Sequence, residues 1–214
     1  MRLLKLFPHL LIALLLAVPP SFALNFPLSD TSARAAYFLG QRHDASMGEF
    51  LARYSKHLPA PKMGPYISDV LFFTPFAQMV LYSSRQGIYS AQQAEVDGRT
   101  KFSTVDVSVY IYFTQTYGPY VPSGSSGNDT RMRGSNFWHD LKFHVFDGDV
   151  LREPASIYGE PLYLCSNDGG CSLVGSQVHL SFPAEMFTSD SATVEVTGPD
   201  DTTIQTAFDL VALR

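Results

Sequence analysis

The sequence predicts a mainly β protein, an antiparallel β-sandwich with two N-terminal α-helices and one short internal helix. The clearest observation is the stretch Thr104–Thr114, in which Val, Ile and Phe alternate with Asp, Ser and Tyr. Residues with this alternation suit a strand with one buried face, here the centre of an antiparallel sheet. Shorter alternating stretches follow at Val178–Phe182 and Ala192–Thr197, and Thr203–Leu213 closes the chain. Several short strands separated by Gly, Pro and Asp turns are typical of a sandwich.

The first residues predict export from the cytoplasm. Arg2 and Lys5 precede the apolar run Leu6–Val18, and Ser21-Phe22-Ala23 has the small-x-small pattern of a cleavage site. We expect residues 1–23 to be a secretory signal peptide, with an uncleaved anchor helix as the alternative. No later stretch is apolar enough to span a bilayer, so the mature protein is expected to be secreted or periplasmic.

The remaining 24–214 divides into an N-terminal helical segment, 24–58, and a β-sandwich domain, 59–214. The chain of 214 residues carries a formal net charge of −5, and removal of the two signal-peptide cations would make it −7. An acidic chain without Lys/Arg clusters excludes nucleic acid as a partner.

Two capping signals predict the N-terminal helices. Ser29 or Asp30 can accept the free amides at the start of the first helix. Ser46 with Glu49 forms a capping box for the second helix, which the prolines from Pro59 onward follow.

Two further segments are ambiguous or short. Phe76–Tyr82 is either a buried strand or, with Thr74 as cap and Pro75 at the first position, a helix; its Phe, Val and Tyr residues favour the strand. Ser90 opens a capping box for a short helix at Ala91–Asp97, with Gly98 as its left-handed end.

A long loop, Gln115–Asn136, leads to a second predicted strand, Phe137–Phe146. If this strand pairs with Thr104–Thr114, the aromatic side chains opposite the core should gather near the loop. This predicts a ligand-binding cluster that suits stacking on a sugar or a peptide. Its members are Tyr110, Tyr112, Trp138, Tyr117 and Tyr120. Ordinary cross-strand packing, or cover by the N-terminal helices, is the alternative interpretation.

The two cysteines, Cys165 and Cys171, flank five polar or glycine residues between short apolar runs. In an oxidising compartment this spacing predicts a β-hairpin closed by a disulfide. Two free thiols are the alternative, since no further ligands accompany them for a metal.

Candidate catalytic and metal-binding residues do not form a motif. His139 and His144 would point to opposite faces of one strand, and His139 is expected to be a hydrogen-bonded core residue. Asp147-Gly148-Asp149 begins like a calcium loop but lacks the third oxygen ligand, so a plain turn is expected. Asn128 begins a glycosylation triplet. Acidic side chains for a hydrolase are available at Glu153, Glu160, Glu185 and Glu195.

The string AYFLGQRHD at Ala36–Asp44, with the later LPAPKMGPYI and TPFAQ, is similar to uncharacterised secreted bacterial proteins. The resemblance implies a location in the bacterial envelope, and no activity or functional residue carries over from it. We therefore expect a non-catalytic binding or interaction module without a cofactor, whose partner is an envelope polysaccharide or protein. The alternatives are a glycosidase-like extracytoplasmic hydrolase and a structural subunit of a surface assembly joined by edge-strand addition.

Overall fold

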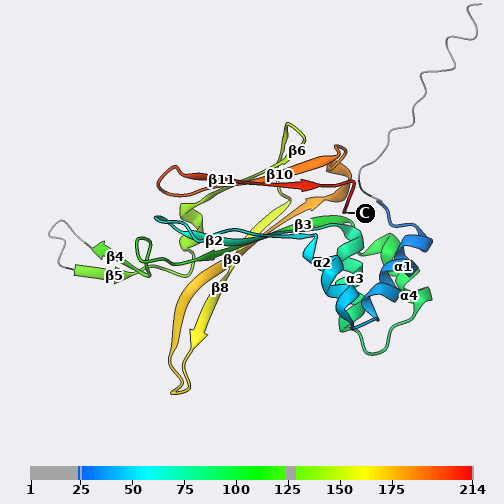
Figure 1. The fold of residues 1–214 in the computed structure, drawn as a ribbon, viewed down its shortest axis with the longest axis horizontal. Coiled ribbons are helices and arrows are strands. Elements are labelled where there is room, and N and C mark those ends of the chain that lie inside the picture. Colours follow the sequence, from blue (N-terminus) through cyan, green and yellow to red (C-terminus); the bar gives the residue numbers. More distant parts are fainter. Residues whose placement is uncertain (1–23, 25, 124–128, 214) are drawn as a thin grey trace, which may run out of the picture.

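The structure is a computed structural model that describes residues 24, 26–123 and 129–213 (Figure 1). The predicted signal peptide 1–23 and the glycosylation triplet's Asn128 lie outside these residues. The helices are α1 (Asp30–Gly40), α2 (Ala45–Ala52), α3 (Pro75–Arg85) and α4 (Ala91–Thr100), with 3-10 turns η2 (Phe137–Asp140) and η3 (Ala184–Met186). The strands are β1 (Ser55–His57), β2 (Tyr66–Phe73), β3 (Thr104–Tyr112), β4 (Tyr120–Ser123), β5 (Asp129–Met132), β6 (Lys142–Asp147), β7 (Val150–Arg152), β8 (Ser156–Cys165), β9 (Cys171–Pro183), β10 (Ser191–Thr197) and β11 (Thr203–Asp209).

The strands form antiparallel sheets, so the prediction of a mainly β fold is confirmed. A five-stranded sheet has the order β1-β2-β3-β9-β8, and a four-stranded sheet has the order β11-β10-β6-β7. The hairpin β4-β5 stands apart as a two-stranded sheet. Strand β3 lies in the middle of the five-stranded sheet, between β2 and β9, as its alternation predicted.

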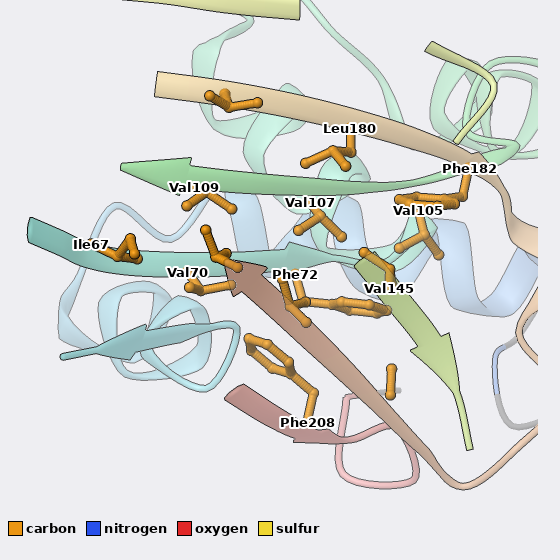
Figure 2. Packing of buried hydrophobic residues seen from close by; sticks show 14 of the residues in the cluster. Ile67, Val70, Phe72, Val105, Val107, Val109, Val145, Leu180, Phe182 and Phe208 are labelled. Atoms are coloured by element: carbon orange, nitrogen blue, oxygen red, sulfur yellow. The ribbon is translucent and has the colours of Figure 1, made fainter. Parts of the chain in front are cut away.

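The main core contains buried side chains from both of the larger sheets (Figure 2). Val105, Val107 and Val109 of β3 are fully buried on this side. Phe72 of the five-stranded sheet stacks on Phe208 of the four-stranded sheet, with 5.2 Å between the ring centroids. Burying apolar side chains from both sheets together is the chief force that holds them against each other.

The helices gather beyond one end of the five-stranded sheet and form a second apolar cluster (Figure 1). Helix α1 packs on α3 and α4, which come from the chain between β2 and β3. Figure 1 shows this cluster at the end of the strands, so it leaves the broad face of the sheet free.

The preference for a strand at Phe76–Tyr82 was wrong, because these residues belong to helix α3. The Thr74 hydroxyl accepts a hydrogen bond from the Ala77 amide, and Pro75 occupies the first turn. A cap and a preorganised first residue outweigh the poor helix propensity of Phe, Val and Tyr when the helix buries one face.

The start of α2 and the end of α4 also differ from the prediction. Helix α2 is capped by Asp44, whose carboxylate accepts the Ser46 amide, so Ser46 is a helical residue and not the cap. Helix α4 begins at the predicted Ser90 cap but continues past Gly98. Gly98 is needed for space: a Cβ atom there would lie 2.8 Å from the Ala33 Cβ.

The predicted strand Phe137–Phe146 is a 3-10 turn followed by β6. Strand β6 pairs with β10 and β7 in the four-stranded sheet, so it is not a neighbour of β3. The loop Gln115–Asn136 contains β4 and β5. The disulfide between Cys165 and Cys171 is present, with an S–S distance of 2.02 Å. It closes the tip of the β8-β9 hairpin, which projects from the body as an arm (Figure 1).

Candidate functional site

The five-stranded sheet turns one face toward the core and the other away from it, and we call the second the outer face. It is defined by the side chains that alternate with the buried ones on neighbouring strands. These are His57, Tyr66, Asp69, Leu71, Asp106, Ser108, Tyr110, Tyr112, Ser156, Tyr158, Glu160, Leu162, Gln177, His179 and Ser181. Apart from the buried Ser108, all are half-buried or exposed. Within the described part of the chain, the outer face is therefore a solvent-accessible polar and aromatic surface.

Tyr110 lies at the centre of the outer face. It pairs across the strands with Asp69 of β2 and Gln177 of β9, and Glu160 of β8 continues the same row. Burial raises the pKa of the Tyr110 hydroxyl, and the neighbouring Tyr112 and the two carboxylates raise it further. A hydroxyl with a raised pKa stays protonated at neutral pH and can donate a hydrogen bond to a ligand.

The adjacent row carries a stacked aromatic pair. The Tyr158 ring lies over the His179 imidazole at 4.8 Å between centroids, with an interplanar angle of 17°. The Ser108 hydroxyl lies 3.1 Å from His179 Nδ1, while Nε2 is buried without a hydrogen-bond partner. Ser108 is 6% exposed, so this Ser–His pair holds the imidazole in place beneath Tyr158 and does not present a nucleophile to solvent.

Two more tyrosines extend the aromatic surface toward the other end of β3. Tyr66 and Tyr112 are directly opposite each other on β2 and β3, with ring centroids 6.3 Å apart. Tyr66 donates a hydrogen bond from its hydroxyl to the Leu58 carbonyl, which fixes the direction of its ring. Tyr110 and Tyr112 thus lie on the face opposite the core, as the alternation of β3 predicted.

The other three predicted site residues are elsewhere. Trp138 is 9% exposed and lies against Gly159 of β8. Gly159 pairs with the fully buried Val178, which places Trp138 on the core side of the sheet. Tyr112 and Trp138 are therefore on opposite faces, and the single cluster expected from the sequence does not form. The expectation failed because it rested on pairing β3 with 137–146.

Tyr117 is a structural residue beneath a surface pocket. It is 7% exposed, and burial raises the pKa of its hydroxyl to about 12. The guanidinium of Arg133 lies 4.0 Å from the Tyr117 ring centroid and donates to Asp140 at 2.8 Å. Tyr117 donates to the same carboxylate oxygen at 3.2 Å, so the three side chains hold the loop together.

The pocket above this network has a volume of about 550 Å³. Residues of β4, β5 and η2 line it, and Arg131, Arg133 and His139 are its basic side chains. Tyr120 is exposed on β4 and does not line it. His139 is exposed and stacks on Trp138, so the expectation of a core histidine was wrong.

The acidic side chains considered for hydrolysis are dispersed. Glu160 is on β8 and Glu185 in η3, Glu153 follows β7, and Glu195 on β10 lies 3.6 Å from His144. Among the described residues, no group of three or more His, Cys, Asp and Glu side chains could hold a metal ion. The predicted turn lies at Gly148-Asp149, with Gly148 at φ 57°, and Asp147 is the last residue of β6.

The sequence interpretation missed Tyr66, Tyr158 and His179 as members of the outer face. The alternation of Val178–Phe182 already contained a signal, because His179 and Ser181 occupy its polar positions. What the sequence lacks is the strand order, which brings β8 and β9 beside β3.

Comparison with models of known protein families and with curated proteins finds no match to this chain. None of the described helices combines the length and the apolar composition needed to cross a bilayer.

Proposed function

We propose that this protein is a non-catalytic binding module of the bacterial envelope, exported by cleavage of residues 1–23. Its two larger sheets form a β-sandwich, and its ligand, an envelope polysaccharide, lies on the outer face. The observation that carries the proposal is the uncovered surface on which Tyr66, Tyr110, Tyr112 and Tyr158 stand among carboxylates and amides.

Sugar rings present flat apolar faces and a rim of hydroxyl groups. Tyrosine side chains offer a ring for stacking and a hydroxyl for hydrogen bonding, so they suit such a ligand. Asp69, Gln177 and Glu160 supply acceptors and donors along the row of Tyr110. Because the side chains come from regular strands, the surface is preorganised, and little entropy is lost when a ligand binds.

The geometry gives less support to the hydrolase alternative. Glycosidases hold two carboxyl groups about 5–10 Å apart. Asp69 and Glu160 are separated by three strand spacings, about 14 Å between their backbones. The side chains of the outer face are half-buried or exposed apart from Ser108, whereas catalytic groups usually converge in a cleft that excludes water.

Calorimetric titration with envelope polysaccharides tests the proposal. Tyr110→Ala and Tyr158→Ala should each weaken binding by roughly tenfold, because each removes one stacking surface. Tyr120→Ala is the matched control, since Tyr120 is an exposed tyrosine on β4 and should not affect the affinity. Loss of binding with Tyr120→Ala alone would place the ligand on the β4-β5 hairpin and contradict the proposal.

A further inference from the structure

Strand β8 combines a free backbone edge with several exposed large side chains. It forms one edge of the five-stranded sheet and pairs only with β9 among the described strands. Four of its large side chains are exposed: Ile157 by 43%, Tyr158 by 51%, Tyr163 by 55% and Leu164 by 69%. Such an apolar edge is a template for pairing with another strand.

The direction of the backbone groups on β8 follows from the hydrogen bonds of β9. The Phe113 amide donates to the Val174 carbonyl, so the even-numbered residues of β9 bond toward β3. The odd-numbered residues of β9 then bond toward β8, and their partners on β8 are even-numbered. The free backbone groups on the outer edge therefore belong to Ile157, Gly159 and Pro161.

Pro161 agrees with this assignment, because it has no amide hydrogen to donate. Proline within a sheet is found where its nitrogen faces away from the neighbouring strand. The edge thus offers amides at Ile157 and Gly159, and carbonyls at all three odd-numbered positions.

We propose that β8 pairs antiparallel with β8 of a second copy of this chain, with Gly159 opposite Gly159 of the second copy. In this register the two glycines exchange both of their backbone hydrogen bonds. The Ile157 amide of each copy donates to the Pro161 carbonyl of the other. Tyr158 stands opposite Glu160, where its hydroxyl can reach the carboxylate.

The neighbouring symmetric registers are poorer. Centring on Pro161 opposes two residues without amides, and centring on Glu160 opposes two like charges. Centring on Tyr158 or Ile157 shortens the overlap, because β8 begins at Ser156. The register centred on Gly159 pairs the strand from Ser156 to Leu162 in both copies.

The dimer axis of such a pair is perpendicular to the sheet. The outer faces of the two copies then lie on the same side of one continuous sheet. A long ligand on the proposed binding face could cross from one copy to the other, although self-association does not depend on that function.

Sedimentation of the purified protein over a range of concentrations tests the pairing. The wild type should associate to a dimer. Ile157→Pro removes an outward amide that makes no bond within the chain, so the variant should fold but remain monomeric. Ile157→Val keeps the amide and should dimerise like the wild type. Pro161→Ala supplies a new donor to the Ile157 carbonyl and should lower the dissociation constant by roughly tenfold.

Cross-linking then checks the register. When Tyr158→Cys protein is mixed with Glu160→Cys protein under oxidising conditions, the two different chains should become linked, and neither variant should link to itself efficiently. A monomeric wild type, or a dimer unaffected by both Ile157→Pro and Pro161→Ala, would overturn the proposal. Pairing of β8 with an extended peptide while the protein stays monomeric would also overturn it.

Discussion

Trp138 lies directly against the backbone of Gly159, so any side chain at position 159 would displace the indole. The contact joins η2 to the arm strand β8 on the core side of the sheet. Gly159→Ala should therefore push the ring toward solvent and destabilise the fold by about 1–3 kcal/mol, the usual cost of overpacking.

Because Trp138 is the only tryptophan, its emission measures the displacement directly. Gly159→Ala should shift the fluorescence to longer wavelength and lower the urea midpoint. Gly170→Ala in the hairpin loop is the control, because the nearest atom to its new Cβ is 3.5 Å away. An unchanged emission spectrum for Gly159→Ala would contradict the contact.

Two helical glycines, Gly98 of α4 and Gly48 of α2, give opposite expectations. Gly98→Ala should destabilise the protein by about 1–3 kcal/mol, because its Cβ would meet the Ala33 Cβ at 2.8 Å. Gly48→Ala in α2 meets nothing within 4 Å and should stabilise the protein by about 0.5–1 kcal/mol. Thermal unfolding of both variants measures the two effects, and a stabilising Gly98→Ala would contradict the close contact with Ala33.

The cap of α2 can be tested by two substitutions. Asp44→Ala removes the acceptor of the Ser46 amide and should lower the free energy of unfolding. Ser46→Ala leaves that backbone hydrogen bond in place and should cost less. If urea unfolding showed a larger loss of unfolding free energy for Ser46→Ala than for Asp44→Ala, Ser46 would be the cap.

The local features that the sequence predicted correctly are those decided by near neighbours in the chain. The alternation of β3, the Ser90 cap of α4 and the disulfide hairpin each depend on side chains a few residues apart. The same reasoning failed at Phe76–Tyr82, where packing against α1 favours a helix that intrinsic propensity disfavours.

The candidate site was predicted only in part, because it depends on strand order. Alternation placed Tyr110 and Tyr112 opposite the core, but the neighbours of β3 are set by long-range pairing. A strand that begins at Lys142 and not at Phe137 also changed the position of Trp138. Tyr158 stacks on His179 because β8 pairs with β9, and no local pattern in the sequence encodes that pairing.

The last prediction concerns the buried carboxylate of Asp147, which is 1% exposed. Burial alone would raise its pKa, but hydrogen bonds from Arg152 and from the amides of Thr188 and Ser189 outweigh that effect, and the pKa lies below its ordinary value of 3.8. The Arg152 guanidinium is 2.8 Å away, and the Ser189 amide is 2.9 Å away. The carboxylate thus ties β6 to the chain that leads into β10.

The depressed pKa makes this contribution to stability dependent on pH. Above 3.8 the carboxylate is ionised in both states, so its full contribution is present. As the pH falls below 3.8 the unfolded chain takes up the proton first, and the contribution is lost as the pH passes through the lower folded pKa.

Asp147→Asn should lower the unfolding free energy at pH 7 by about 3 kcal/mol, since it leaves Arg152 without its charge partner. It should also flatten the decline in stability as the pH falls below 3.8, which urea unfolding at several pH values would measure. Asp149→Asn, an exposed carboxylate in the same turn, is the matched control and should retain the wild-type slope. Equal slopes for wild type and Asp147→Asn would show that the acid sensitivity has its origin elsewhere.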